Sequence, residues 1–110
     1  MAIDKNIISG STTMLILSLL SEQDMYGYQM ISIVNKRTNN CFEMKNGTLY
    51  PLLHNLEEQG MIVSYESESD SGRVRKFYRI TPLGKTVLKE KKIEWRTFIT
   101  SINYVMGGLE

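Results

Sequence analysis

Apolar residues recur at helical spacing in the first part of the chain. Residues 13–21 are apolar on nearly every side of a helix, which indicates burial on more than one side. A second apolar face is formed by Tyr26, Met30, Ile33 and Val34. Asp24 stands just before this face and is a favourable N-cap, because its carboxylate can accept a hydrogen bond from a first helical turn. The pattern predicts a buried helix over 13–21 and an amphipathic helix that begins directly after Asp24 and ends at Asn39-Asn40.

A third helical stretch contains a proline. Its apolar face is spaced i, i+3, i+4 and i+7 and consists of Leu49, Leu52, Leu53 and Leu56. Pro51 has no N–H to donate and clashes with the preceding turn of a helix, so we expect the helix to begin near Gly47 or Thr48. Pro51 then lies within about the first turn, where it costs little. Gly60 is expected to end the helix in the left-handed conformation.

The pattern changes from helical to alternating after Gly60. Residues 61–68 and 74–80 alternate as strands do, and Asp70-Ser71-Gly72 between them suits a tight turn. On the return strand we expect Lys76, Tyr78 and Ile80 on one face and Arg75, Phe77 and Arg79 on the other. A short helix followed by a hairpin with a basic return strand is typical of a winged helix-turn-helix. We therefore expect residues 46–84 to present a helix to the DNA major groove and a hairpin to the backbone beside it.

A long helix is predicted after the hairpin. Thr81-Pro82 combines an N-cap with a proline at the first helical position. The helix is expected to run from Pro82 to about Met106, which is roughly 37 Å. Its second half carries an apolar stripe of Trp95, Phe98, Ile99, Ile102, Val105 and Met106. Few helices of one chain remain to cover this stripe, so we interpret it as an interface with a second copy.

The distribution of charge is more informative than the net charge. The chain has 110 residues, which favours one domain, and a formal net charge of +1. Five acids and no base lie from Glu57 to Asp70, whereas eight bases and one acid lie from Arg73 to Lys92. Clustered bases can bind phosphate even in a chain that is nearly neutral. From charge alone, an equally good interpretation is that these bases form only a solvated face on a strand and a long helix.

Composition argues against several classes of function. Cys41 is the one cysteine, which excludes an internal disulfide and suits a reducing compartment. One cysteine and one histidine cannot form a structural zinc site, and no glycine-rich phosphate loop or catalytic motif is present, so we expect no enzyme, metal or cofactor. Residues 1–9 lack the pattern of a signal peptide, and the longest apolar run, 14–20, is shorter than the roughly 20 residues that span a bilayer. We expect a cytoplasmic protein without membrane contact.

The sequence resembles the PadR family of transcriptional regulators, and the resemblance extends over nearly the whole chain from Thr12 to Trp95. The matching motifs are Tyr26-Gly27-Tyr28, Gly47-Thr48-Leu49-Tyr50-Pro51, Leu53, Leu56-Glu57-Glu58-Gln59-Gly60, Arg73, Arg75-Lys76-Phe77-Tyr78 and Ile80-Thr81-Pro82-Leu83-Gly84. The resemblance implies an α+β, mainly α, winged helix-turn-helix with a long C-terminal dimerisation helix. We expect a DNA-binding part in residues 1–81, a dimerisation helix in residues 82–110, and a homodimeric repressor of a pseudo-palindromic operator.

The expected partner is double-stranded DNA. The candidate DNA-binding residues are Tyr28, Gln29, Lys45, Asn46, Thr48, Tyr50, Pro51, Asn55, Arg73, Arg75 and Lys76. Asn55 can pair with adenine, and long cations beside the hairpin turn suit phosphate. The resemblance implies that Tyr50 approaches DNA, although a tyrosine there also suits packing on a neighbouring helix. Cross-strand ion pairs of Glu66 or Glu68 with Arg75 or Lys76 are an alternative use of the hairpin bases, and His54 is interpreted as a surface residue.

The last helix is expected to dimerise, together with the first. The candidate interface residues are Leu15, Leu88, Trp95, Phe98, Ile99, Ile102, Val105 and Met106. In multidrug-sensing relatives a tryptophan at the position of Trp95 lines a pore at the dimer centre, so the resemblance implies a planar aromatic effector bound by Met14, Ser18, Trp95 and Ile99. Ile99 stands where an acidic pore residue is expected, which argues against cationic drugs and leaves neutral aromatic ligands open.

Two other classes of function remain open from the sequence. One is a winged helix that serves protein–protein interaction, in which the hairpin bases bind an acidic partner. The other is a small-molecule binding protein without a DNA role.

Overall fold

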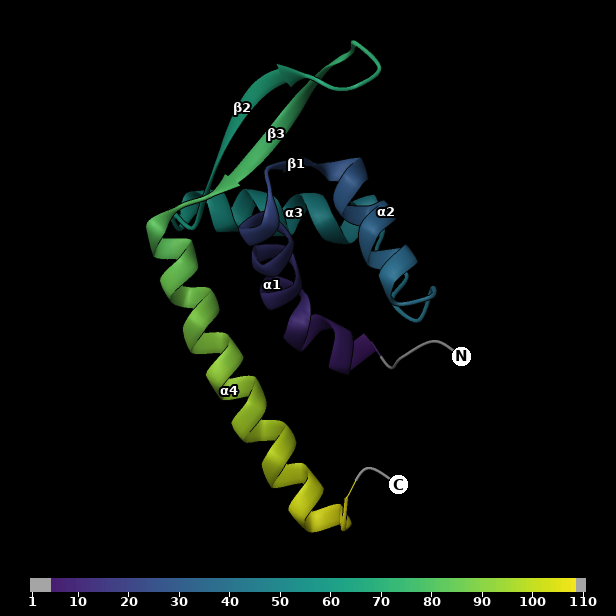
Figure 1. Cartoon of the computed structure of the whole chain (residues 1–110), viewed down its shortest axis with the longest axis vertical. Coiled ribbons are helices and arrows are strands. Elements are labelled where there is room, and N and C mark those ends of the chain that lie inside the picture. The colour runs from purple at the N-terminus through teal and green to yellow at the C-terminus, as the bar shows by residue number, and fades with distance from the viewer. Residues whose placement is uncertain (1–4, 109–110) are drawn as a thin grey trace.

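The computed structural model describes residues 5–108. Within that range the chain forms helix α1 (Lys5–Glu22), strand β1 (Met25–Tyr26), helices α2 (Gly27–Arg37) and α3 (Asn46–Glu58), strands β2 (Ile62–Glu68) and β3 (Val74–Ile80), and helix α4 (Pro82–Met106) (Figure 1). The mainly helical winged helix-turn-helix predicted from the sequence is confirmed. We call β2, β3 and the turn between them, residues 62–80, the wing.

The sheet has the strand order β1-β3-β2 and is antiparallel throughout the described chain. Tyr26 pairs with Phe77, and Phe77 pairs with Tyr65, so one row of aromatic residues crosses all three strands. The prediction that α2 begins directly after Asp24 is wrong. Residues 25–26 form β1 instead, because Met25 is buried and the Asp24 carboxylate contacts the wing, and α2 begins at Gly27.

Helix α1 is longer than predicted, because it begins at Lys5 rather than at residue 13. The small polar residues 9–12 favoured a break, yet a glycine costs a helix only about 1 kcal/mol. Ser11 and Thr12 are buried in the structure, so packing outweighs this local preference.

The core lies between α1, α2, α3, the start of α4 and one face of the sheet. Ile16, Leu17, Met25, Met30, Leu49, Leu53 and Ile62 are its largest fully buried side chains. The predicted apolar face of α3 is confirmed, since Leu49, Leu53 and Leu56 are buried and Leu52 packs against the core. On β3, Tyr78 and Ile80 are buried as the alternation predicts. This packing leaves the opposite side of α3 free of the core.

The predicted position of Pro51 within the first turn of α3 is wrong. The Lys45 carbonyl accepts the N–H groups of Thr48 at 3.0 Å and Leu49 at 2.9 Å, so helical bonding starts one or two residues earlier than expected. Pro51 is therefore the sixth residue of α3 and removes one hydrogen bond to the Gly47 carbonyl. The end of the helix is as predicted, with Gly60 at a φ of +77°.

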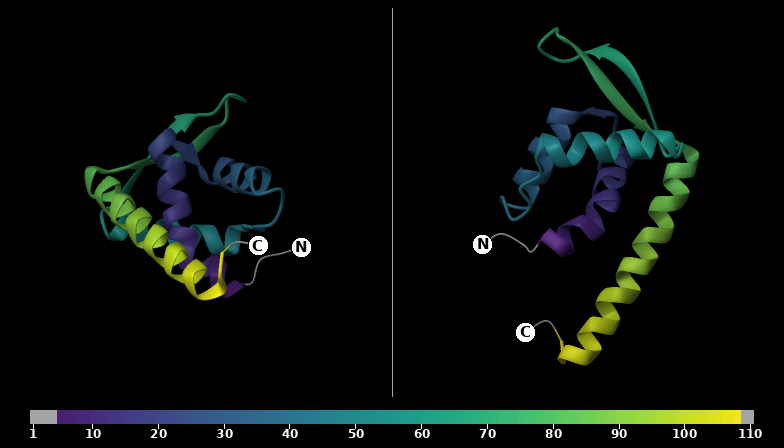
Figure 2. Two further views of the ribbon diagram at one scale, coloured as in Figure 1. Left: turned by 60° about the horizontal axis from the view of Figure 1, so that its bottom comes forward. Right: turned by 180° about the vertical axis from the view of Figure 1, so that it is seen from behind.

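Helix α4 begins as the sequence predicts. The hydroxyl of Thr81 accepts the Gly84 N–H at 3.0 Å and donates to the Gly60 carbonyl at 2.6 Å, which fixes the first turn against the end of α3. Gly84 and Leu88 are buried on the core. The helix then runs away from the wing and the core, so its C-terminal half stands apart from the rest of the chain (Figures 1 and 2).

Candidate nucleic-acid interface

The outward side of α3 is open to solvent along its N-terminal half. Every predicted contact residue on and just before this helix is exposed, namely Lys45, Asn46, Thr48, Tyr50, Pro51 and Asn55. No acidic side chain lies in the first turn, so the positive end of the helix dipole is not neutralised locally. Asn55 lies farther along, in the C-terminal half of α3, and within the described chain its side chain is held by a 3.4 Å contact from Gln59, which leaves most of its amide free. The N-terminal end of α3 therefore has the solvent exposure and the positive electrostatic potential that a DNA-contacting helix needs.

Tyr50 combines packing with exposure. Its ring lies against Gly27, the first residue of α2, with the Cζ atom only 2.8 Å from the place where a Gly27 side chain would begin. The side chain nevertheless remains 46 % exposed. The packing on a neighbouring helix that the sequence allowed is therefore present, and the exposed part of the ring leaves a contact with DNA open as a prediction. Gly27 was not singled out as a functional residue, since nothing local in the sequence reveals that contact.

The first turn of α2 lies beside this ring. Tyr28 is 68 % exposed and free to contact a ligand. Gln29 is more restricted, because its Oε1 accepts the backbone N–H of Tyr26 at 3.0 Å and caps the start of α2. The amide nitrogen of Gln29 has no such restraint in this contact, so it is the freer end of the side chain.

The tip of the wing is a closed turn. The Ser69 N–H donates to the Arg73 carbonyl at 2.8 Å, the Gly72 N–H donates to the Ser69 carbonyl at 2.8 Å, and Gly72 has a φ of +83°. Arg73 directly follows this glycine with an exposed side chain. The turn thus holds one cation at the end of the hairpin farthest from the core (Figure 1).

The other two predicted wing contacts, Arg75 and Lys76, lie over aromatic rings. The Arg75 guanidinium is 5.3 Å from the Tyr26 ring centroid, and the Lys76 ammonium is 5.6 Å from that of Tyr78. The cross-strand ion pairs considered above are absent among the described side chains, although Glu66 lies opposite Lys76 in the register. Both cations keep their charge available, but the Nε of Arg75 is buried without a hydrogen-bond partner in the described chain, so Arg75 is the less accessible.

The single histidine stays a surface residue, as the sequence indicates. The Nε2 of His54 lies 2.7 Å from the Glu58 carboxylate one turn along α3, and both side chains are exposed. A carboxylate at this point makes the C-terminal half of α3 less attractive to phosphate than its N-terminal half.

The predicted dimer face is exposed or half-buried except at one position. The exposed fractions are 38 % for Trp95, 55 % for Phe98, 38 % for Ile102, 88 % for Val105 and 65 % for Met106, and Ile99 and Leu15 are half-buried. Leu88 is different, because it is 5 % exposed and belongs to the core of this chain. Leu88 therefore offers almost no surface to a second chain.

The predicted effector residues lie on two helices. Met14 and Ser18 of α1 are half-buried, and on α4 the rings of Trp95 and Phe98 lie 5.9 Å apart. A cavity of about 360 Å³ lies elsewhere, near the end of α4, and is lined by Thr100, Asn103, Tyr104, Gly107 and Gly108. None of the predicted effector residues lines that cavity.

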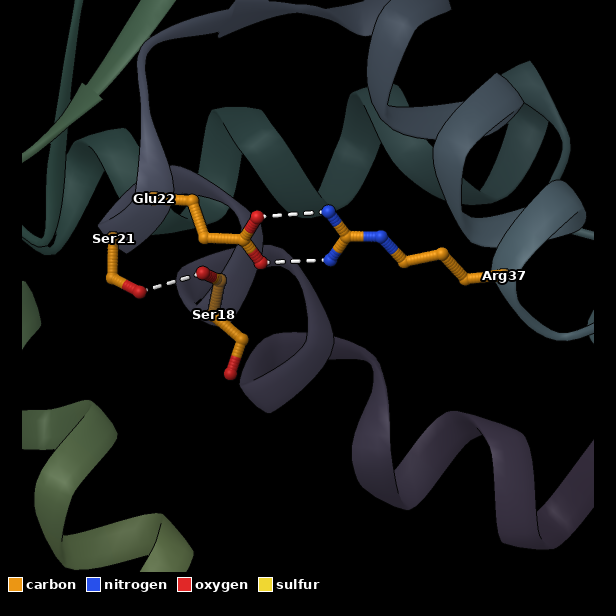
Figure 3. A network of polar contacts seen from close by, with 4 residues as sticks. All are labelled: Ser18, Ser21, Glu22 and Arg37. Carbon is orange, nitrogen blue, oxygen red and sulfur yellow. Dashed lines mark hydrogen bonds and ion pairs between the residues drawn. The ribbon is translucent and has the colours of Figure 1, made fainter.

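A bidentate ion pair joins the end of α1 to the end of α2. Arg37 donates to both carboxylate oxygens of Glu22, at 2.7 and 2.8 Å (Figure 3). These hydrogen bonds lower the pKa of Glu22 and raise that of Arg37. One turn earlier the Ser21 hydroxyl donates to the Ser18 carbonyl at 2.6 Å. The pair connects a helix of the predicted dimer face to the helix-turn-helix.

The described chain offers neither a metal-binding cluster nor a membrane-spanning helix. No group of three histidine, cysteine, aspartate or glutamate side chains in it could hold a metal ion. None of its helices combines the length and the apolarity that crossing a membrane requires.

Comparison with known proteins identifies relatives along nearly the whole chain. The model of the transcriptional regulator PadR-like family matches residues 16–90. An uncharacterised protein of Lysinibacillus sphaericus is 41 % identical over 105 residues, which are 96 % of each chain. A transcriptional regulator of Mycobacterium tuberculosis is 45 % identical over 67 residues, which are 61 % of this chain and 59 % of the relative.

Solved structures share the fold over its full extent. A transcriptional regulator from Clostridium thermocellum has a TM-score of 0.86 at 37 % identity and covers 94 % of this chain and 97 % of its own. A PadR-like transcriptional regulator from Bacillus cereus has a TM-score of 0.85 at 28 % identity and covers 96 % of this chain and all of its own. The long α4 is thus included in the shared architecture.

Proposed function

The chain belongs to the PadR-like family of transcriptional regulators, and on that premise we propose that it is a repressor that binds a pseudo-palindromic operator as a homodimer. In this proposal α3 enters the major groove, and the wing contacts the backbone beside it. Residues 1–81 form the DNA-binding part and residues 82–110 the dimerisation helix, of which 1–4 and 109–110 lie outside the described residues. Gly84 and Leu88 join the two parts into one unit, because both are buried on the core.

The observation that carries the proposal is the open N-terminal half of α3 beside unneutralised wing cations. Thr48 and Asn55 are exposed polar side chains on α3 and can contact base edges. Arg73 and Lys76 are exposed and form no ion pair within the described chain, so they remain available for phosphate. Few residues would contact base edges, and the remaining contacts would be to phosphates, which are the same in every sequence. We therefore expect each half-site to be recognised with modest sequence specificity.

The exposed apolar stripe of α4 supports the homodimer. Apolar residues from Trp95 to Met106 face solvent in the single chain, and a contiguous apolar surface of this kind marks an interface. A two-fold dimer would present two copies of α3 at a fixed spacing, and that symmetry matches a pseudo-palindrome.

The same stripe supports a planar aromatic effector at the dimer centre. Trp95 is 38 % exposed, so its ring remains available to stack on a flat ligand after dimerisation brings a second tryptophan near. A ligand that binds one arrangement of the dimer better than another shifts the spacing of the two α3 helices. Release from the operator would follow.

A gel-shift assay with a fragment of the chain's own promoter region tests the proposal. Sequence-selective retardation that weakens with salt is the expected result, because phosphate contacts release counterions. Lys76→Ala should weaken binding, whereas Lys89→Ala, which removes the same charge from an exposed position on α4, should leave the affinity close to the wild-type value. Absence of retardation at low salt would favour a protein-binding winged helix. Biological activity that survives both Tyr50→Ala and Lys76→Ala would favour a ligand-binding protein without a DNA role.

A further inference from the structure

The short segment between α1 and α2 holds the wing through the pairing of β1 with β3 and through one carboxylate. The Oδ2 of Asp24 accepts hydrogen bonds from the Tyr65 hydroxyl of β2, at 2.5 Å, and from Nε of Arg79 of β3, at 3.1 Å. The Nη2 of Arg79 forms an ion pair with the same oxygen at 3.0 Å. One acid therefore ties both strands of the wing to the point where the chain passes from α1 to α2. We call Asp24, Tyr65 and Arg79 the wing anchor.

Aromatic packing completes the contact on the same face of the sheet. The rings of Tyr26 and Phe77 meet edge to face at 5.3 Å, and those of Tyr65 and Phe77 stack at 5.8 Å. The Arg79 guanidinium lies 5.0 Å from the Tyr65 ring centroid. The hydroxyl that Asp24 binds thus belongs to a ring already packed in the row, so moving the carboxylate would disturb the whole face.

The wing needs such a tether. β1 pairs with β3 at residues 77–78, so from residue 66 to residue 76 the wing is a two-stranded hairpin, which is marginally stable on its own in water and twists readily. Beyond residue 68 the wing consists only of the turn, and Arg73 lies in this turn, at the end of the wing far from the core. A small rotation at the base of the hairpin therefore becomes a large displacement of Arg73 relative to α3.

The residues of the wing anchor are too exposed to stabilise the fold strongly, but they can fix the orientation of the wing. The Asp24 side chain is 27 % exposed and that of Arg79 is 60 % exposed, so the pair contributes little to global stability. The hydrogen bond to Asp24 also raises the pKa of Tyr65, which keeps the phenol protonated as the donor. The contact of Asp24 with Tyr65 and Arg79 is directional and partly solvated. We therefore expect it to affect the orientation of the wing more than the free energy of unfolding.

We propose that Asp24 is the positioning residue of the wing: it sets the angle of the hairpin to α3 and so places Arg73 and Lys76 on the phosphate backbone. The proposal rests on the proposed DNA-binding function. It assigns to Asp24 a role in binding although its carboxylate would repel DNA if it touched it. Because Asp24 lies only two residues beyond the end of α1, a displacement of α1 would reach the wing through the same residue.

The test compares Asp24→Asn with Glu22→Gln. Each variant removes one negative charge and weakens one exposed arginine–carboxylate pair at the end of α1, but the Glu22 pair leads to α2 and not to the wing. With the promoter fragment as probe, Asp24→Asn should bind about tenfold more weakly than Glu22→Gln, and the salt slope should fall by about 1 to 2, as expected for lost phosphate contacts. Tyr65→Phe, which keeps the ring stack, should change both quantities in the same direction by less.

A double-mutant cycle separates positioning from a general loss of fold. Arg73→Ala should weaken binding in the wild-type background and have little further effect in Asp24→Asn, because a misplaced wing no longer delivers that cation. Equal affinities and equal salt slopes for Asp24→Asn and Glu22→Gln would overturn the proposal. An unchanged effect of Arg73→Ala in the two backgrounds would also overturn it.

A measurement without DNA keeps the anchor separate from the proposed function. Amide hydrogen exchange should become faster in β2 and β3 for Asp24→Asn and stay at the wild-type rate for Glu22→Gln. Wild-type protein that fails to bind any promoter fragment would defeat the proposed function, while slow exchange in the wing of Asp24→Asn would defeat the anchor itself.

Discussion

The phenol of Tyr50 occupies the space where a side chain at Gly27 would begin. A Cβ atom at that position would overlap the hydroxyl and lie 2.8 Å from Cζ of the ring. Gly27 is the first residue of α2, and Tyr50 lies on the open side of α3. The two helices of the helix-turn-helix are thus fitted to each other at the surface that we propose contacts DNA.

Gly27→Ala should weaken operator binding by displacing this ring. The overlapping atoms are the far end of a flexible side chain, so Tyr50 can rotate outward and the free energy of unfolding should change by less than about 1 kcal/mol. Operator affinity should fall about tenfold, in the range expected for one lost contact. Fluorescence anisotropy with the promoter fragment measures the affinity, and urea unfolding measures the stability.

The double variant Gly27→Ala/Tyr50→Ala is the control. If the glycine acts only by giving room to the ring, the double variant should bind no more weakly than Tyr50→Ala alone. Additive losses would show that Gly27 acts on DNA binding by another route.

The periodicity of apolar residues predicted the helices and strands of this chain better than it predicted the contacts that join them. Leu49, Leu53 and Leu56 share a face because any amphipathic helix must bury one, and that requirement is visible in sequence. Asp24 was misinterpreted as an N-cap because the rule uses only near neighbours, whereas its partners Tyr65 and Arg79 lie far along the chain. Similarly, nothing local connects Gly27 to Tyr50.

Gly84→Ala should destabilise the fold even though alanine is the better helix former. A Cβ at Gly84 would overlap the backbone carbonyl of Met61 and lie 2.7 Å from Cγ1 of Ile80. Backbone cannot yield as a side-chain tip does, so the first turn of α4 must move away from the core. We expect a loss of about 2 kcal/mol or more in the free energy of unfolding, since overpacking exceeds the roughly 1 kcal/mol gained in helix propensity.

Gly47→Ala is the matched control for this stability measurement. It makes the same substitution within a helix, but nothing lies within 4 Å of its Cβ position. Urea unfolding should show equal or slightly higher stability for Gly47→Ala. A Gly84→Ala protein as stable as the wild type would mean that α4 does not depend on its contact with Met61.

Ile102→Asp should convert the proposed dimer into a monomer. Ile102 lies within the exposed stripe of α4, and a carboxylate there would be buried without a partner in an apolar interface. Ile93→Asp is the control, because Ile93 is 54 % exposed on the opposite side of the same helix. Sedimentation velocity should give a monomer for the first variant and a dimer for the second. A dimer in both would place the interface elsewhere.

Trp95 offers a direct test of the proposed effector site. It is the one tryptophan in the chain, so intrinsic fluorescence at long wavelength reports on this ring alone. A neutral planar aromatic that stacks on Trp95 should quench that emission in the wild type. Tyr104→Ala, which removes an aromatic ring from the far side of α4, should leave the quenching unchanged because Tyr104 is 85 % exposed and away from the stripe.

Calorimetry on Trp95→Ala then decides whether the tryptophan holds the ligand or only stands near it. Stacking on a flat ring supplies about 1 kcal/mol beyond the area that it buries, and two symmetry-related rings would double that share. Loss of both faces should lower the affinity by at least about tenfold. Quenching in the wild type combined with unchanged affinity in Trp95→Ala would locate the ligand beside the ring rather than against it. Met14 and Ser18 of α1 and Ile99 of α4, the other residues of the predicted site, would then be the next positions to replace.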